Sequence, residues 1–594
     1  MGRRPRSLRK RRPPERATAV RDRLRAVSRG VPLAAVLCAA AALRLAGLGA
    51  GEPDPFYDAA VRSMGTSWHA LLVGAFEPGA RVAIDKPPVD LWLQVASTKL
   101  FGFTTTALEL PAAIAGTLAV AAVYDLGRVL FGRRAGLAAA AALAVLPVAV
   151  ITARSDTMDS VMAALVALAA ALTARAARSG RPALLVAAGA VLGLAFEVKL
   201  FEALVAAPAL VALWWWATEG DARPRAMALG GAGAAFCAVA LAWLCAVSLV
   251  PGPSRPFALG SANGSAWGAV FVYDGIDRLH ASPAPHTEPP TAAALARAPA
   301  PPGVARLLST HASLQGRVGL EVAAAVAALA LALAGGAWSR LDRGGRAGLG
   351  ALAVWLACGL VLASAMHDLR PRYLEAFTPA VAAVLGVGAV LAARGRARVP
   401  VALAFAGVIA VSLVVSVEAV AAHRTDSGRP GWIPPARVAA LSAFLRGHDG
   451  TAADEVATVA PSKAAQVIAR DGRPVLVLAS VDGRPLVTPR ALTADVAAGR
   501  VRYALVGDRC VRPDTAACTP VARWIRARGV DVSAAAGQPH RGLVYRLRQT
   551  PTTARARTSP RSRAAARRSH RRASAAPHGA RRARRRSRSA PARA

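Results

Sequence analysis

The stretch Ile84-Asp85-Lys86-Pro87-Pro88 places an acidic and a basic side chain side by side, directly before two prolines. Proline fixes its own backbone and restricts the residue before it, so the charged pair is presented rigidly and any preceding helix ends here. The stretch lies in the polar segment 49–108, between apolar runs. Charges at the edge of membrane helices usually face a partner or a polar cavity, so this pair indicates a functional site.

The surrounding sequence predicts an all-α polytopic membrane protein. Hydrophobic residues make up 54% of the 594 residues and the mean hydropathy is +0.37. Apolar runs of roughly 18–22 residues recur, which is long enough to cross a bilayer. We predict about eleven spanning helices of this length. They lie near residues 31–48, 109–131, 136–153, 159–177, 183–198, 200–217, 227–250, 319–338, 347–366, 373–393 and 400–421.

The arginine-rich loops predict the orientation. Lys and Arg in short loops mark the cytoplasmic side, and such loops alternate regularly along the predicted helices, at 1–29, 132–134, 175–181, 223–225, 340–346 and 394–398. We therefore expect a multi-pass membrane protein with a cytoplasmic N-terminus and an extracytoplasmic C-terminus. The outer side then holds loops 49–108 and 251–318, and the short segments around 154–158, Lys199 and 367–372.

Four regions follow from these patterns. Residues 1–29 form a basic cytoplasmic segment, 30–425 the transmembrane domain, 430–548 a small outer α/β domain, and 549–594 an Arg-rich tail expected to be disordered. In the outer domain, apolar strands near 474–479 and 501–506 alternate with helical patterns. The net charge of +40 is concentrated in the two ends. These ends lack interleaved aromatic residues, so they favour anionic lipid or wall polymer over nucleic acid.

Lysine is rare in this arginine-rich chain. Of 74 Lys and Arg residues only five are lysine, and Lys86 and Lys199 lie at the predicted outer membrane edge. A compact ammonium binds phosphate as a point charge, unlike the forked guanidinium. We therefore predict that these two lysines hold an anionic phosphate.

Acidic residues gather at the same predicted edge. The candidates in the first outer loop are Asp54, Tyr57, Asp58, His69 and Asp85. Asp156 and Asp159 follow the third predicted helix, and on a helical turn their spacing would place them on one face. N-capping explains one such aspartate and less easily both.

Three further features stay open. The segment 251–318, rich in Pro, Ala and Ser, contains Arg278 and is either a linker or a lid over the cavity. Cys510 and Cys518 enclose a short polar loop and are disulfide candidates if that segment is extracytoplasmic. No residue spacing requires a cofactor, and whether a divalent metal binds at Asp85 or Asp159 stays unknown.

The order of these motifs resembles a known family. Asp54 with Tyr57, Ser67-Trp68-His69, Asp85-Lys86-Pro87-Pro88, Asp156 with Asp159, and then Lys199 are similar to the GT-C membrane glycosyltransferases of family 39. That branch includes protein O-mannosyltransferase-like and aminoarabinose-transferase-like bacterial enzymes, so the resemblance implies a protein of the bacterial cell membrane. The resemblance covers about residues 30–425, and residues 430–548 resemble the outer domain of a bacterial mannosyltransferase-like subgroup.

The resemblance implies an enzyme that moves a sugar from a polyprenyl-phosphate donor to an extracytoplasmic hydroxyl, with inversion. Mannose or a related hexose is expected, while a pentose and the nature of the acceptor (protein, lipid or polysaccharide) stay open. The implied roles are a base at Asp54, a donor cavity with Asp85 and Asp159, and phosphate contacts from Lys86, Lys199, Arg372 and Tyr373. The chain reads Pro53-Asp54-Pro55 where the family commonly has Asp-Glu, so Asp58 and Asp85 remain rivals as the base.

Two other classes compete with this interpretation. A transporter or flippase for lipid-linked saccharides would share a basic, phosphate-facing cavity. It should also show inverted repeats and broken midplane helices, whereas the charges here gather at one face and the sequence shows no internal repeat. A structural envelope protein would not need Asp54, Asp85 and Asp159 together.

Overall fold

The computed structural model describes residues 31–277, 302–308, 314–366, 369–428, 433–448, 450–507, 510 and 516–548. The chain divides into two compact units, Met1–Gln549 and Thr550–Ala594, and all the described residues lie in the first. Arg278 and the Arg-rich tail, both singled out from the sequence, lie outside the described residues.

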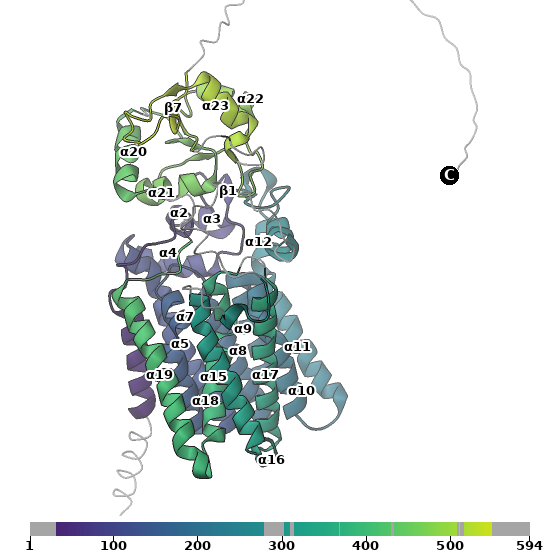
Figure 1. Cartoon of the computed structure of the whole chain (residues 1–594). Coiled ribbons are helices and arrows are strands. Elements are labelled where there is room, and N and C mark those ends of the chain that lie inside the picture. Colours follow the sequence, from purple (N-terminus) through teal and green to yellow (C-terminus); the bar gives the residue numbers. More distant parts are fainter. Residues whose placement is uncertain are drawn as a thin grey trace, which may run out of the picture. The chain divides into compact units, whose positions relative to one another are not determined.

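A bundle of long apolar helices forms the main body of the first unit (Figure 1). Five helices among the described residues are long and apolar enough to cross a membrane, or six if one bent pair is a single span. The five are α5 (Thr105–Phe131), α8 (Asp159–Ser179), the run Pro182–Ala217, α17 (Arg343–Ala365) and the run Gly395–Ala421, which contains α19 (Arg398–Ala421). The bent pair is α11 (Ala222–Ala240) with α12 (Ala242–Ser248). Shorter apolar helices occur at Val31–Leu45, within α15 (Leu314–Ala334), and at α18 (Thr378–Ala392).

The structure breaks one of the predicted spans and separates two others where the sequence predicted. The span predicted at 136–153 consists of α6 (Arg133–Val145) and α7 (Pro147–Thr152), because Pro147 begins a new helix and proline cannot donate to the preceding turn. The spans predicted at 183–198 and 200–217 are separate helices, α9 (Pro182–Lys199) and α10 (Ala207–Ala217), joined by a 3-10 turn that begins with Leu200 at a positive φ of 50°. The total of eleven spans stays a prediction.

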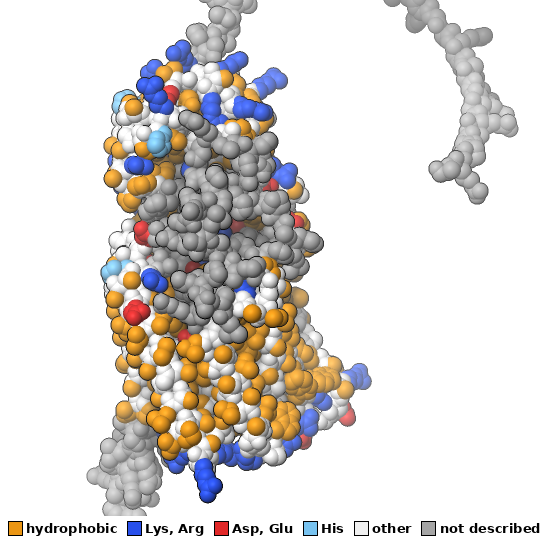
Figure 2. Space-filling model, viewed as in Figure 1, with side chains coloured by type: hydrophobic (Ala, Val, Ile, Leu, Met, Phe, Trp, Pro, Cys, Tyr) orange, Lys and Arg blue, Asp and Glu red, His pale blue; other side chains and the backbone are white. Residues whose placement is uncertain are grey.

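Hydrophobic side chains cover the flank of the helix bundle, and Lys and Arg side chains gather at its lower end (Figure 2). Exposed side chains on α19 such as Val399, Leu403 and Val414 belong to this apolar surface. A large exposed apolar surface of this kind is stable only against lipid or another apolar partner. The fold is therefore that of a multi-pass membrane protein.

The predicted first outer loop, residues 49–108, contains three short helices and one strand. These are α2 (Pro55–Met64), α3 (Trp68–Val73), β1 (Val82–Ala83) and α4 (Val89–Phe101). Strand β1 pairs in parallel with β2 (Phe257–Ala258), so the first outer loop and the segment after α12 are joined. The charged stretch at 84–88 follows β1 directly, and Pro88 stands at the N-cap of α4.

The C-terminal region forms an α/β domain around a five-stranded sheet of order β4-β3-β5-β7-β6. The strands are β3 (Ala457–Thr458), β4 (Leu476–Val477), β5 (Tyr503–Leu505), β6 (Val530–Asp531) and β7 (Val544–Arg546). Strands β4, β3 and β5 are parallel, whereas β7 is antiparallel to both of its neighbours. The helices are α20 (Pro435–His448), α21 (Pro461–Asp471), α22 (Pro489–Ala497) and α23 (Pro520–Arg528).

This domain is joined to the first outer loop by specific polar contacts. The Arg81 guanidinium donates two hydrogen bonds to the Asp454 carboxylate, at 3.0 and 2.5 Å, and a third to the Val475 carbonyl at 3.2 Å. Helix α2 also packs against α21. The loop that carries the predicted acids is therefore held between the helix bundle and the α/β domain.

Candidate active site

Asp54 lies buried at the start of α2, where the backbone enters the helix. It is the N-cap residue: Pro55 occupies the first helical position, and one Asp54 carboxylate oxygen accepts from the Phe56 backbone N–H at 3.1 Å. Aspartate followed by proline is a favourable start for a helix. The second carboxylate oxygen accepts from the Gly428 backbone N–H at 2.9 Å. Capping is thus part of the role of Asp54, and it holds the carboxylate in one orientation.

Asp156 joins Asp54 and Asp58 into one acidic cluster. The Asp54 backbone N–H donates to Asp156 Oδ2 at 2.6 Å. Asp58, one turn further along α2, shares a side-chain hydrogen bond with Asp156, and burial raises the pKa of Asp58 well above its usual range. Burial also raises the pKa of Asp156, to about 6. A neutral Asp58 that donates to an ionised Asp156 fits these shifts, because two adjacent buried carboxylates cannot both ionise cheaply.

A basic group faces the acids from the other side. Lys199, the last residue of α9, pairs with Asp159, the first residue of α8, and its Nζ lies 3.1 Å from Glu202. The Lys199 ammonium also lies 4.9 Å from the centre of the Tyr373 ring. Helix α9 ends at Lys199, where the apolar run Pro182–Ala217 is broken. This break places the lysine side chain beside Asp159 and Glu202.

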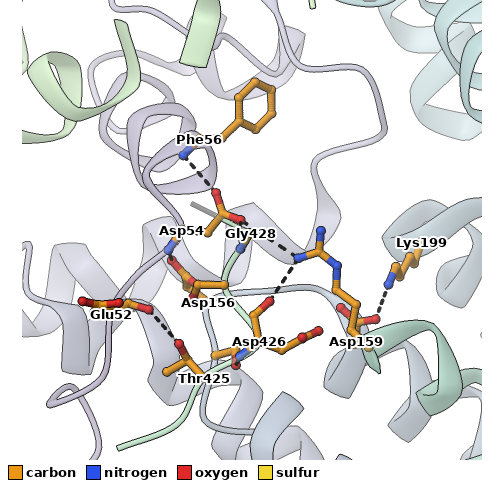
Figure 3. Close-up of polar contacts among 12 residues, drawn as sticks. Glu52, Asp54, Phe56, Asp156, Asp159, Lys199, Thr425, Asp426 and Gly428 are labelled. Atoms are coloured by element: carbon orange, nitrogen blue, oxygen red, sulfur yellow. Dashed lines mark hydrogen bonds and ion pairs between the residues drawn. The ribbon is translucent and has the colours of Figure 1, made fainter. Parts of the chain in front are cut away.

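Arg372 connects the two sides. Its Nη1 lies 4.0 Å from Asp54 Oδ2 and donates at 3.3 Å to the Asp426 carbonyl. The Arg372 side chain is buried. Figure 3 shows this polar network with Asp54, Asp156 and Asp426 within it and the Asp159–Lys199 pair beside it. An acid that can accept a proton and a cation that can bind phosphate therefore meet in one place.

Lys86 and Asp85 form a neighbouring pair. Lys86 Nζ lies 3.2 Å from Asp85 Oδ1 and 5.7 Å from the centre of the Tyr57 ring. Burial raises the pKa of Tyr57, while the positive charges of Lys86 and Arg372 oppose that increase. Tyr57 therefore lies within the electrostatic influence of both cations and links the pair to the main cluster.

The structure does not bring together every residue singled out from the sequence. His69 is exposed on α3. Asp156 and Asp159 do not share one helical turn, because Asp156 lies in the loop before α8 and Asp159 begins that helix. Neither aspartate is the N-cap of α8, since that position is Met158.

The structure does pair the two candidate cysteines of the α/β domain. Cys510 and Cys518 form a disulfide.

The segment Thr425–Gly428, here called the strap, was missed by the sequence reasoning. It follows α19 and bonds to the site at every position. Thr425 donates to the Glu52 carbonyl at 2.8 Å, and the Asp426 N–H donates to Ser155 Oγ at 2.8 Å. Ser427 Oγ donates to Asp156 Oδ1 at 3.3 Å. A polar run directly after the last apolar helix was the available signal, but nothing in it identified a partner.

The described residues contain no group of three or more His, Cys, Asp or Glu side chains arranged to hold a metal ion. The charged groups of the site instead form ion pairs and hydrogen bonds with one another. Such an arrangement can place a carboxylate near an incoming hydroxyl, where it could accept the proton. It can also surround an anion with lysine and arginine, which stabilise negative charge.

Comparisons with known proteins agree with the resemblance that the motifs indicated. Residues 85–243 match the family described as dolichyl-phosphate-mannose-protein mannosyltransferase. Residues 441–528 match the family described as "Putative mannosyltransferase YkcB-like, C-terminal". The two matched segments lie in the transmembrane region and the α/β domain respectively.

Two curated relatives come from Bacillus subtilis (strain 168). The chain is 32% identical to "Putative mannosyltransferase YycA" over 226 residues, which is 38% of this chain and 33% of the relative. It is also 32% identical over 226 residues to "Putative mannosyltransferase YkcB", covering 38% and 32% of the two chains. The matched region thus spans about a third of the length of these relatives.

Solved structures share the fold. ArnT from Cupriavidus metallidurans, solved bound to undecaprenyl phosphate, matches with a TM-score of 0.50 at 17% identity, over 75% of this chain and 86% of that one. Archaeal oligosaccharyltransferase AglB from Archaeoglobus fulgidus, solved with an inhibitory peptide and a dolichol-phosphate, matches with a TM-score of 0.51 at 14% identity, over 79% and 69%. These solved structures show that the chain shares their fold, and the two family matches show that residues 85–243 and 441–528 are similar to mannosyltransferase families.

Proposed function

We propose that this chain, a family-39-like protein with the GT-C fold, is a membrane glycosyltransferase. It moves a sugar from a polyprenyl-phosphate donor to an acceptor hydroxyl outside the cytoplasmic membrane. Mannose or a related hexose is the expected sugar. The observation that carries the proposal is the 4.0 Å approach of the Arg372 guanidinium to the Asp54 carboxylate, because it puts a candidate base and a phosphate-binding cation in one site.

The reaction is a direct displacement at the anomeric carbon of the sugar. The acceptor oxygen forms a bond to this carbon as the bond to the phosphate oxygen breaks, so the configuration inverts. The hydroxyl proton passes to Asp54. Both Asp54 oxygens already accept backbone N–H groups, but an ionised carboxylate offers about four lone-pair sites, so a hydroxyl can still approach.

The leaving group is a polyprenyl phosphate, whose negative charge grows as the bond breaks. Arg372 and Lys199 stabilise that charge from within the cluster, and Lys86 does so from the neighbouring pair. Asp159 holds Lys199 in place through their ion pair. Asp85 holds Lys86 in the same way. Asp58 is a weaker candidate for the base than Asp54, because burial and the neighbouring Asp156 raise its pKa and so favour its protonated form.

The proposal also includes the orientation: the N-terminus lies in the cytoplasm and the α/β domain lies outside. Cysteine substitutions at Arg133 and Ser462, in a chain without its native cysteines, test this with a membrane-impermeant thiol reagent. Only the second position should react in intact cells. Labelling at both positions, or at Arg133 alone, would contradict the orientation.

The decisive experiment offers the purified protein a panel of radiolabelled polyprenyl-phosphate sugars and follows release of the sugar to acceptor or water. The panel includes mannose, glucose and arabinose donors. Release from at least one donor, lost in an Asp54→Asn Arg372→Met double variant, supports the proposal. If the folded protein binds the donors but neither transfers nor releases any sugar, a lipid-saccharide transporter is the better interpretation.

A further inference from the structure

The strap supplies an acidic side chain that the chemistry above does not use. Asp426 is fixed from both sides of its backbone: its N–H donates to Ser155 Oγ at 2.8 Å, and its carbonyl accepts from Arg372 at 3.3 Å. The neighbouring strap residues bond to Asp156 and Asp54. The Asp426 side chain is therefore held at a defined place in the cluster.

These contacts use the backbone of Asp426 and not its carboxylate. Its Oδ2 is buried and has no hydrogen-bond partner within the described structure. The charges that act on it come from three elements: Arg372 and Arg370 at the turn before α18, Asp159 on α8, and Lys199 on α9. These include the residues assigned above to the donor phosphate. Asp426 thus lies among the groups that would surround a bound donor.

We propose that Asp426 is a further residue of the donor end of this site, which positions the Arg372 guanidinium and takes up a proton when the donor phosphate binds. This inference rests on the proposed function, because it needs a phosphate at Arg372. It assigns Asp426 a positioning role and not that of the base, since its contacts lead to Arg372 and not toward an acceptor.

The physical reason is the charge balance around Asp426. Burial already raises the pKa of Asp426 to about 7, and Arg372 limits that increase. A phosphodiester that binds to Arg372 brings a negative charge close to the carboxylate, so its protonated form becomes still more favourable. Donor binding and proton uptake are then linked. The donor binds more tightly at pH values below about 7 and more weakly as the pH rises above it.

The test measures the affinity of the full-length purified protein for a polyprenyl methyl phosphodiester across neutral pH. This probe mimics the donor linkage, and its single charge does not change near neutrality. For the unsubstituted protein, we expect the Kd to rise with pH by up to about tenfold per pH unit above pH 7. Asp426→Asn cannot ionise and should keep the tight, low-pH affinity with most of the pH dependence lost. Asp426→Glu should restore the dependence.

Glu418→Gln is the matched control. It removes one exposed carboxylate near the same end of α19, and it should leave the pH dependence unchanged. An Asp426→Asn variant with the original slope would overturn the inference, and so would one that weakens binding equally at every pH. If the unsubstituted protein fails to bind the phosphodiester at any pH, the proposed function fails as well. If Asp426→Asn binds the phosphodiester with an unchanged pH dependence of the Kd, only the role of Asp426 is rejected and the proposed function still stands.

Discussion

The backbone N–H of Asp54 donates a hydrogen bond to the Asp156 carboxylate, with 2.6 Å between nitrogen and oxygen, across 102 positions of the chain. This contact joins the start of α2 to the loop before α8. The candidate base is thus held by a second acid, Asp156, which also bonds to Asp58 and Ser427. Deleting either carboxylate would therefore change both the geometry and the charge of the site. An asparagine substitution keeps the shape of the side chain and removes only the charge.

Asp54→Asn should lower transfer by roughly 10²–10⁴-fold, the usual contribution of general acid–base catalysis. Asparagine keeps one oxygen for the Phe56 N–H and therefore the helix cap, but it has no basicity. Single-turnover rates with bound donor measure this, and affinity for the phosphodiester should be nearly unchanged. Turnover close to that of the unsubstituted protein would move the base to Asp58 or Asp85.

Lys199→Met should weaken donor binding and leave the protein folded, provided that the buried Asp159 is also neutralised. Removing the lysine alone leaves Asp159 without its ion-pair partner, and an unpaired buried charge is strongly destabilising. The informative comparison is therefore Lys199→Met Asp159→Asn against Asp159→Asn alone, each assayed for phosphodiester affinity. Lys199→Arg should be impaired too if a point charge is required.

Lys99 offers the control for the lysine series. It is exposed on α4, on the same outer loop as Lys86. Lys99→Met should leave donor affinity unchanged, whereas Lys86→Met should weaken it. Equal affinity in the Lys86, Lys99 and Lys199 variants would reject the assignment of the phosphate-binding lysines.

Asp90 should make stability depend on pH. It lies buried on α4, where burial raises its pKa to about 7, although the Gln94 amide donates to it at 2.7 Å. Between its unfolded pKa of about 4 and its folded pKa near 7, the folded state holds a proton that the unfolded state releases. Stability contributed at this site therefore falls as the pH rises through that window.

Asp90→Asn removes that ionisation. Thermal unfolding of the purified protein at several pH values should show a flatter profile in this variant, with a gain in melting temperature that grows from about pH 4 to about pH 7 and stays constant above it. Asp482→Asn, at a half-buried turn of the α/β domain where the carboxylate pairs with Arg484, is the control. An unchanged profile in Asp90→Asn would show that the carboxyl is ionised in the folded protein.

Arg81 should connect the α/β domain to the first outer loop. Arg81→Met leaves the buried Asp454 carboxylate without its two donors, so the melting temperature should fall and protease cleavage of the α/β domain should increase. Adding Asp454→Asn should recover part of the loss. The Arg81 side chain is 44% exposed, so the measured coupling should stay below about 1 kcal/mol. If Arg81→Met is as stable as the unsubstituted protein, the contact between Arg81 and Asp454 contributes nothing to stability.

The sequence by itself determined the chemical character of the site and its place along the chain. Long apolar runs define membrane helices regardless of packing, so acids and lysines at the ends of those runs must lie near the membrane edge. That reasoning singled out Asp54, Asp85, Asp159 and both lysines as candidates, and it predicted strands near β4 and β5. It depended on local composition and periodicity, which sequence records directly.

Only the tertiary structure decided which of these residues meet. The strap reaches Ser155 and Asp156 across 271 positions, and Arg81 reaches Asp454 across 373. Such contacts depend on how whole helices and loops pack, and no local pattern encodes that. The same packing left His69 exposed and brought Asp426 beside Arg372. The sequence does not distinguish these two cases, because the burial and the partners of a polar residue outside the apolar helices are set by distant segments.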